Sequence, residues 1–523
     1  MRPCRLAVLA CAGLLAHAAV AIAQQPSFPT DDPVIRRIWE EGMERSQVYP
    51  LSQVLADSIG PRLVGSPGYD AAADWLIRTY GSWGIPARRE AYGNWRGWER
   101  GTTHIDLLQP RVRTLEGTML AWSPGTGRPV TAPVVLLPEF RSAADFQAWL
   151  PQAKGKYVLV TFPEPTCRPD EQWLDFTAGG ARQMLAQRDS ARQRWHGRIA
   201  ATGLDERGLL HRLDSAGVAG ILTSAWIGGY GTMRVLWANT ERAPAPALSC
   251  EDYGLLARLA ANGQGPLVRV DARAKFLGER PAYNVIAELR GTELPDETVI
   301  LSAHLDSWDA GSGATDNGTG TVIMAEAMRI LKAVYPNPRR TIIAGHWGSE
   351  EQGLNGSRAF VADHPGLLDG IQAVFNQDNG TGRIARISAQ GFIGAGEHLA
   401  RWFSRIPDQL TAGIDLTFPG NPGGGGSDYA SFVCAGIPAF GLGSASWDYF
   451  AYTWHTNRDT FDKVSIDDVR ANAVLTAMLV YLAAEDPERV PRDRRIVASR
   501  RTGEPGSWPA CSAPARSSTS RFF

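Results

Sequence analysis

The stretch Thr298-Val299-Ile300-Leu301-Ser302-Ala303-His304-Leu305-Asp306 decides the fold class. Its first five residues predict a buried strand, and a helix is expected over about 320–333. Further strands are expected at 341–344, 371–375 and 437–442. Strands that alternate with helices predict an α/β fold with a mostly parallel mixed sheet flanked by helices, which binds ligands beyond the carboxyl ends of its strands.

Acidic residues and histidines gather just after these strands. They are His304, Asp306, Asp316, Glu350, Glu351, Asp378 and His455. Five uncompensated acids in one pocket would repel one another, and several would take up protons. Two divalent cations remove that conflict, and a mixed set of imidazole and carboxylate groups suits Zn²⁺. A zinc pair is typically bridged, so one acid should bridge the ions while another stays free as a base.

Several segments carry a family resemblance. They are His304 to Asp309, Trp347 to Gly353, Ser427 to Phe432 with Ala435 to Pro438, Gly60 to Arg62 with Gly65-Ser66, and Asn284 to Ala287. Together they resemble the co-catalytic di-zinc exopeptidase family that contains bacterial leucine aminopeptidase and plasma glutamate carboxypeptidase (carboxypeptidase Q). The resemblance implies a zinc exopeptidase fold and two zinc ions per chain. It also implies a metallopeptidase that hydrolyses terminal peptide bonds of small peptides or dipeptides, with a water activated between the metals.

The resemblance also assigns a role to each site residue. It implies that His304 and Asp378 hold one zinc, that Glu351 and His455 hold the other, that Asp316 bridges both, that Glu350 is the general base and that Asp306 orients His304. One position departs from the family, because relatives often have His where this chain has Tyr429. No oxyanion-stabilising side chain is assigned, and Tyr429 and Tyr452 are only candidates for that role.

The chain divides into five predicted parts. Residues 1–23 read as a secretory signal peptide with Arg2, Arg5, an apolar run and the cleavage site Ala21-Ile22-Ala23, which predicts a secreted or periplasmic protein. An uncleaved membrane anchor is the alternative. The other parts are the N-terminal part of the peptidase domain (24–110), a β-rich insertion (111–275) that resembles a protease-associated domain, the catalytic domain (276–488) and a disordered tail (489–523).

The charge balance limits the class of binding partner, and the cysteine content predicts a disulfide. Lys plus Arg is 53 and Asp plus Glu is 54, so the net charge of −1 gives no reason to expect nucleic acid or an anionic membrane as partner. The expected partner is a peptide substrate, and the family resemblance suggests a possible homodimer. Four cysteines lie beyond the signal peptide, and one disulfide, Cys167–Cys250, is predicted for an exported protein.

The sequence leaves three questions of function open. Aminopeptidase action needs an acid near the free amine, whereas carboxypeptidase or dipeptidase action needs Arg, Lys or backbone donors for a free carboxylate. Arg62 is weighed for that carboxylate, although a structural salt bridge is favoured, and His346 is expected to be a packed residue at a strand end. A non-catalytic binding or receptor protein, and a one-zinc glutaminyl cyclase-like acyltransferase, remain as alternatives on the same fold.

Overall fold

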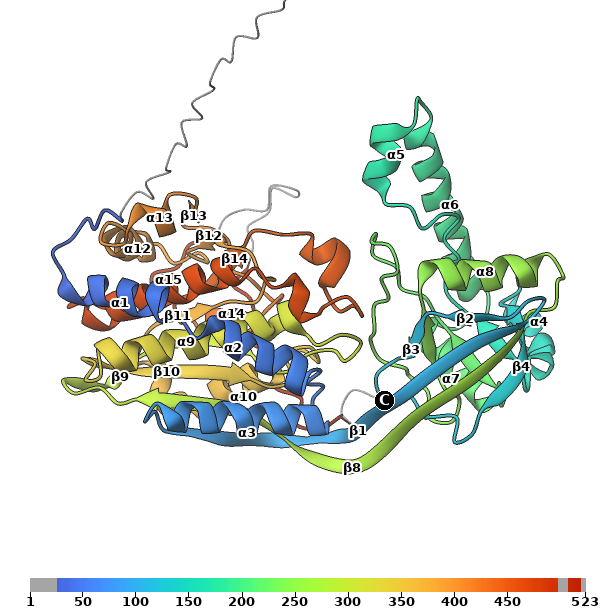
Figure 1. The fold of residues 1–523 in the computed structure, drawn as a ribbon, viewed down its shortest axis with the longest axis horizontal. Coiled ribbons are helices and arrows are strands. Elements are labelled where there is room, and N and C mark those ends of the chain that lie inside the picture. Colours follow the sequence, from blue (N-terminus) through green and yellow to red (C-terminus); the bar gives the residue numbers. More distant parts are fainter. Residues whose placement is uncertain (1–25, 497–506, 519–523) are drawn as a thin grey trace, which may run out of the picture.

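The computed structural model describes residues 26–496 and 507–518. Figure 1 shows two lobes joined by a long two-stranded ribbon. The ribbon consists of β1 (Ala87–Gln109) and β8 (Leu267–Leu289), which pair in antiparallel fashion. Both strands extend from the first lobe into the second, so the inserted region begins and ends within strands and not within loops.

The first lobe is built on a mixed sheet whose strands follow the order β13-β12-β14-β11-β9-β10-β8. The bounds are β9 (Leu294–His304), β10 (Arg340–Trp347), β11 (Ile371–Asn376), β12 (Ile384–Ser388), β13 (Asp415–Thr417) and β14 (Ala439–Ser444). Strands β10, β9, β11 and β14 pair in parallel, while β8 and β12 are antiparallel to their neighbours β10 and β14. The predicted α/β class with a mostly parallel mixed sheet is confirmed.

Helices cover both faces of this sheet (Figure 1). One face carries α1 (Pro33–Glu44), α2 (Val48–Gln53), α9 (Thr319–Val334) and α15 (Ile466–Glu485), and the other carries α3 (Pro67–Ser82) and α10 (Asn355–Asp363). The shorter helices are α11 (Pro365–Leu368), α12 (Ala395–Phe403), α13 (Asp408–Thr411) and α14 (Tyr429–Cys434). Helix α3 begins with a capped first turn, because the Ser66 side chain accepts from the Tyr69 amide and Pro67 begins the helix.

The second lobe holds strands that continue the large sheet from β8, a separate two-stranded sheet and its own helices. Its strands are β2 (Arg113–Leu115), β3 (Gly117–Met119), β4 (Val130–Leu136), β5 (Tyr157–Leu159), β6 (Gly220–Leu222) and β7 (Pro246–Leu248). Its helices are α4 (Ala143–Trp149), α5 (Asp170–Phe176), α6 (Ala181–Ala200), α7 (Glu206–Ser215) and α8 (Cys250–Ala261). Strands β4, β5 and β6 pair in parallel, and α5 and α6 project away from the lobe (Figure 1).

Two disulfides are present, and one of them was not predicted. Cys167 pairs with Cys250 as the sequence analysis expects, and Cys434 pairs with Cys511. The second bond explains why residues 507–518 differ from the expected disordered tail. Trp508 donates its ring N–H to the carbonyl of Val433 at 2.8 Å, and Asn94 forms a bridge with Ser517. This part of the C-terminal segment therefore packs on the first lobe and on β1.

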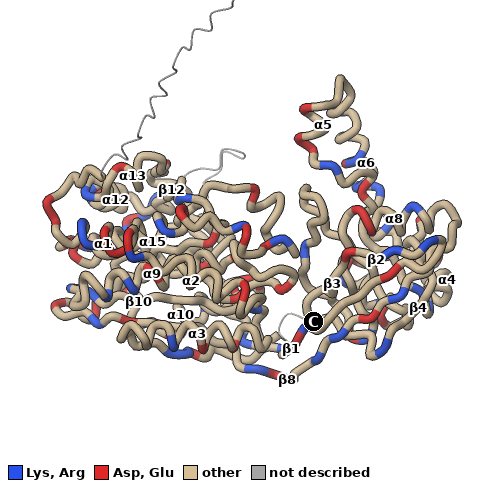
Figure 2. Tube along the Cα trace, viewed as in Figure 1, with Lys and Arg blue, Asp and Glu red and all other residues tan. Residues whose placement is uncertain are grey.

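Charged residues of both signs are spread over both lobes (Figure 2). In the part of the chain that the structure describes, every helix is too short or too polar to cross a bilayer. The predicted signal peptide, residues 1–23, lies outside the described residues.

Candidate metal centre

The carboxyl ends of the central strands bring the predicted metal ligands together. His304 is the last residue of β9, Glu351 follows β10, and Asp378 follows β11. Asp316 lies in the short helical turn η3 (Ala314–Gly318) before α9, and His455 follows the turn η4 (Tyr449–Thr453). Because parallel strands end at one edge of a sheet, five residues spread over about 150 positions of the chain converge there.

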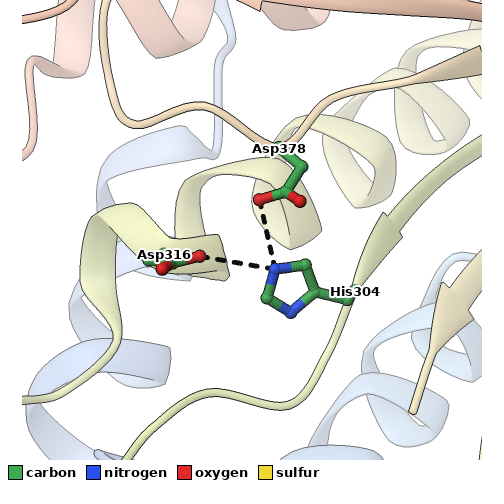
Figure 3. A group of neighbouring side chains, drawn as sticks. All are labelled: His304, Asp316 and Asp378. Carbon is green, nitrogen blue, oxygen red and sulfur yellow. Dashed lines mark hydrogen bonds and ion pairs between the residues drawn. The ribbon is translucent and has the colours of Figure 1, made fainter. Parts of the chain in front are cut away.

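The first group of ligand atoms surrounds His304 (Figure 3). The imidazole Nε2 lies 3.1 Å from Oδ1 of Asp378 and 3.4 Å from Oδ1 of Asp316. The His304 side chain is almost fully buried. Three donor atoms of zinc-compatible type therefore face one another in a protected position.

The second group of ligand atoms surrounds His455. Its Nε2 lies 2.9 Å from Oε2 of Glu351 and 3.2 Å from Oδ2 of Asp316. Asp316 thus turns one carboxylate oxygen toward each histidine. This is the geometry expected of an acid that bridges two cations, and the two groups share only this residue.

Buried atoms without partners indicate that the site fits cations. Oδ2 of Asp316 and Oε1 of Glu351 are buried and have no hydrogen-bond partner. Burial raises the pKa of Glu351 to about 7, and the charge of Asp316 adds to the shift while that of His455 opposes it. Burial would lower the pKa of His455, but the carboxylates of Glu351 and Asp316 raise it to about 10. Negative charge is therefore in excess around both histidines, and the donor set fits zinc.

Glu350 lies beside the ligands without belonging to either group. Its Oε2 is 4.0 Å from Nε2 of His304. Burial raises the pKa of Glu350 well above its usual range; the charge of His304 opposes this shift and that of Asp378 adds to it. A nearby cation favours the ionised form of a carboxylate. Glu350 is thus an unligated acid whose protonation state depends on what occupies the neighbouring groups.

Asp306 contacts His304 more closely through its main chain than through its carboxylate. The Nδ1 atom of His304 bonds the main-chain carbonyl of Asp306 at 2.8 Å, whereas the carboxylate Oδ1 is 3.6 Å away. The carboxylate accepts from the backbone N–H groups of Glu350 and Glu351 at 3.1 and 3.3 Å. Asp306 therefore orients His304 through its backbone and fixes the glutamate pair through its side chain.

Two residues that support the site escaped the sequence analysis or were assigned another role. Asp459 is buried and accepts from the backbone N–H groups of Thr315 and Asp316 at 2.7 and 3.0 Å. The one sequence feature that could have drawn attention to Asp459 is its position four residues after the predicted ligand His455. Arg62 is fully buried and forms no salt bridge with the described residues; it donates to four carbonyls, those of Leu305, Gly60, Ser312 and Gly313.

The remaining candidates lie around the centre. Trp308 is buried, with its ring centroid 6.0 Å from that of His455. His346 is buried and forms a hydrogen bond with the Tyr80 hydroxyl at 2.7 Å. This confirms the prediction that His346 is a packed residue at the end of a strand. Tyr429 is half-buried, and burial raises its pKa, with the charge of Asp378 adding to the shift. The ring of Tyr452 packs near Gly229 of the second lobe.

The fold and the clustered donors define the class of metal-dependent exopeptidases, and the comparisons with known proteins agree. Residues 284–480 match the sequence profile of Peptidase family M28. Carboxypeptidase Q of Rattus norvegicus is 25% identical over 452 residues, which cover 86% of this chain and 88% of that protein. Carboxypeptidase Q of Homo sapiens is also 25% identical, with the same coverage. The resemblance predicted from the sequence is confirmed.

Solved structures share the fold. A peptidase M28 precursor from Shewanella amazonensis is 24% identical with a TM-score of 0.63, and the match covers 88% of this chain and 97% of that chain. A zinc aminopeptidase from Bacillus subtilis is 19% identical with a TM-score of 0.54, covering 85% and 96% of the two chains. The shared fold therefore extends along nearly the full length of these two solved structures.

Proposed function

We propose that this protein is a zinc-dependent exopeptidase that hydrolyses terminal peptide bonds of small peptides or dipeptides with two zinc ions per chain. The observation that carries the proposal is the pair of donor groups that share Asp316, with Glu350 left free beside them. His304 and Asp378 would hold one ion, and Glu351 and His455 the other. A receptor without catalysis would not need a complete donor set together with an unligated acid.

Zinc, when bound, supplies Lewis-acid chemistry that acidifies water and polarises a carbonyl group. The residues of the chain supply the proton transfers and the geometry. Glu350 takes the proton of the attacking water and delivers it to the leaving amine. Asp306 holds the backbone of Glu350 in place, so the carboxylate stays within reach of both groups. Trp308 and Trp454, whose rings lie 6.0 and 4.2 Å from the His455 ring, would form part of the wall of the substrate site.

The names of the relatives bear on which terminus is cleaved. The full-length relatives at 25% identity are carboxypeptidases Q, and the zinc aminopeptidase is related through fold alone. This supports carboxypeptidase or dipeptidase action over aminopeptidase action. Export to a secreted or periplasmic location is part of the proposal, and the two disulfides support it, since such bonds persist in oxidising compartments.

Hydrolysis of three substrate types tests the proposal. Zinc-loaded protein is given a free dipeptide, an N-blocked dipeptide and an amino-acid anilide, with Glu350→Gln as the inactive control. Hydrolysis of any of them that stops on chelation and returns with zinc supports an exopeptidase, and the preferred substrate gives the terminus. A protein that loads two zinc ions and leaves all three intact is a binding protein. One that closes N-terminal glutamine into a ring with one zinc is a cyclase.

A further inference from the structure

Arg234 of the inserted lobe lies directly beside the metal centre. The segment 233–235 pairs with the loop that carries His455: the Val235 N–H donates to the His455 carbonyl at 3.0 Å, and Arg234 forms an antiparallel bridge with Thr456. Met233 adds a bond from its N–H to Oδ1 of Asn457 at 2.8 Å. The backbone of the second lobe therefore fixes the position of Arg234 relative to a proposed zinc ligand.

The guanidinium of Arg234 stacks on the wall of this site. Its central carbon lies 4.2 Å from the ring centroid of Trp454, and that ring lies 4.2 Å from the imidazole of His455. The side chain is half-buried. Burial lowers the pKa of Arg234, and the charge of Glu351 opposes that shift, so the group remains a cation near neutral pH. A positive charge thus lies one aromatic ring away from His455 and close enough to the donor groups to interact with the charge of Glu351.

Among the residues that the structure describes, this cation has no partner of opposite charge. Its Nε is buried without a hydrogen bond, and within residues 26–496 and 507–518 no carboxylate lies within ion-pair distance of it. Two arginines near the junction of the lobes are paired instead: Arg458 with Glu116 at 2.6 Å, and Arg100 with Asp309 at 2.7 Å. Burying an unpaired charge is costly, so the arrangement is best explained by a ligand that supplies the missing anion.

We propose that Arg234 binds a carboxylate group of the peptide substrate and so determines specificity at the metal centre. The inference rests on the proposed function and names its substrate class: short peptides with a free carboxylate next to the scissile bond. A planar guanidinium held against an aromatic ring keeps its fork of N–H donors free for bidentate binding of a carboxylate. The carboxylate can belong to the C-terminus or to an acidic side chain, and the two sources need separate substrates.

The experiment compares matched substrates. These are alanylalanine, its C-terminal amide, and the amide of alanylglutamate, which carries a carboxylate on the side chain only. Arg234→Met keeps the length and the stacking of the side chain but removes the charge. Arg192→Met is the matched control, because Arg192 also belongs to the inserted lobe and lies over an aromatic ring (Phe162, 5.6 Å) but already has a carboxylate partner, Glu164 at 2.6 Å.

In the wild-type protein we expect a preference for the carboxylate substrate. Arg234→Met should raise KM about 10- to 100-fold for the substrate whose carboxylate Arg234 binds, with kcat changed less than about threefold. The same variant should leave KM for the amide of alanylalanine, which has no carboxylate, unaffected. If KM rises only for alanylalanine, Arg234 binds the C-terminal carboxylate. If KM rises only for the amide of alanylglutamate, Arg234 binds the side-chain carboxylate. An equal loss on all three substrates, or none, would overturn the inference, as would a wild-type protein without any carboxylate preference.

Binding separates this inference from the proposed function. Calorimetry with an uncleavable phosphinic dipeptide analogue, in its carboxylate and carboxamide forms, reports the same preference without catalysis. If the protein cleaves nothing, the proposed function fails, yet a carboxylate preference that Arg234→Met abolishes still supports the role of Arg234. Arg234→Lys, with retained zinc content and melting temperature, should keep part of the preference; retention of the full preference in Arg234→Met contradicts the role.

Discussion

Arg62→Met tests how the loop that carries Asp316 is held. The Arg62 side chain is fully buried and donates to the carbonyls of Leu305, Gly60, Ser312 and Gly313 at 2.7–3.0 Å. Burial lowers the pKa of Arg62 to about 10, so the guanidinium is charged at neutral pH. Two of the four carbonyls lie three to four residues before Asp316, which makes Arg62 the clamp between η3 and the end of β9.

The magnitude follows from the number of bonds. Each buried carbonyl left without its donor costs roughly 1 kcal/mol or more, so four of them predict about 4 kcal/mol. Relief of the desolvated charge offsets part of this, and we expect a net loss of about 2–4 kcal/mol in unfolding free energy for the first lobe. Arg62→Lys retains the charge but not the planar fork, and should lose about half as much.

Urea unfolding in the presence of a chelator measures the loss without a contribution from metal. Hydrogen exchange of residues 312–318 should rise in Arg62→Met, which locates the effect in the Asp316 loop. The control is Arg78→Met on the exposed face of α3, for which a change below about 0.5 kcal/mol is expected. A loss below about 1 kcal/mol in Arg62→Met, or exchange unchanged at 312–318, would refute the clamp.

Three further predictions concern the site and the C-terminal segment. Glu350→Gln should retain zinc but lose about 10²- to 10⁴-fold in kcat, because the general base is gone; near-normal turnover would sink that assignment. Asp316→Ala should lose most bound metal by elemental analysis, since the bridge is the one donor that both groups share, and unchanged zinc content argues against a bridge. The bond from Arg516 holds the pKa of Asp363 below its usual value, so it stabilises docking of residues 507–518 above the unfolded-state pKa and is lost as pH falls through the folded-state pKa. Proteolysis of this segment should therefore increase in acid, and Asp363→Asn should remove the pH dependence; an identical pH profile in both proteins contradicts it.

The central sheet was predictable because its strands are buried on both faces. Strands β9, β10, β11 and β14 each contain an apolar run that is buried, as parallel strands in α/β proteins do, and helix α9 is buried around nearly its whole circumference. The ribbon of β1 and β8 was not predictable. Its register shifts at four places, and its alternation is interrupted by exposed charged residues, so no single period marks 23 residues as one strand.

In the site, too, residue type and local position predicted the metal donors, whereas residues that depend on the folded path of the chain were not predicted. His304, Asp316, Glu351, Asp378 and His455 were found because their residue types are zinc donors and because each follows a strand or lies in a loop. Arg62 and Asp459 act on main-chain atoms, and the position of such partners depends on the folded path of the chain. Arg234 comes next to His455 only through pairing between segments more than 200 residues apart.

The amount of zinc bound per chain tests the central claim most directly. Purified protein loaded with excess zinc and then freed of unbound metal should contain two zinc ions per chain by elemental analysis, since Asp316 presents one oxygen to each group of donors. A content of one ion or none would contradict the shared centre on which the proposed hydrolysis depends.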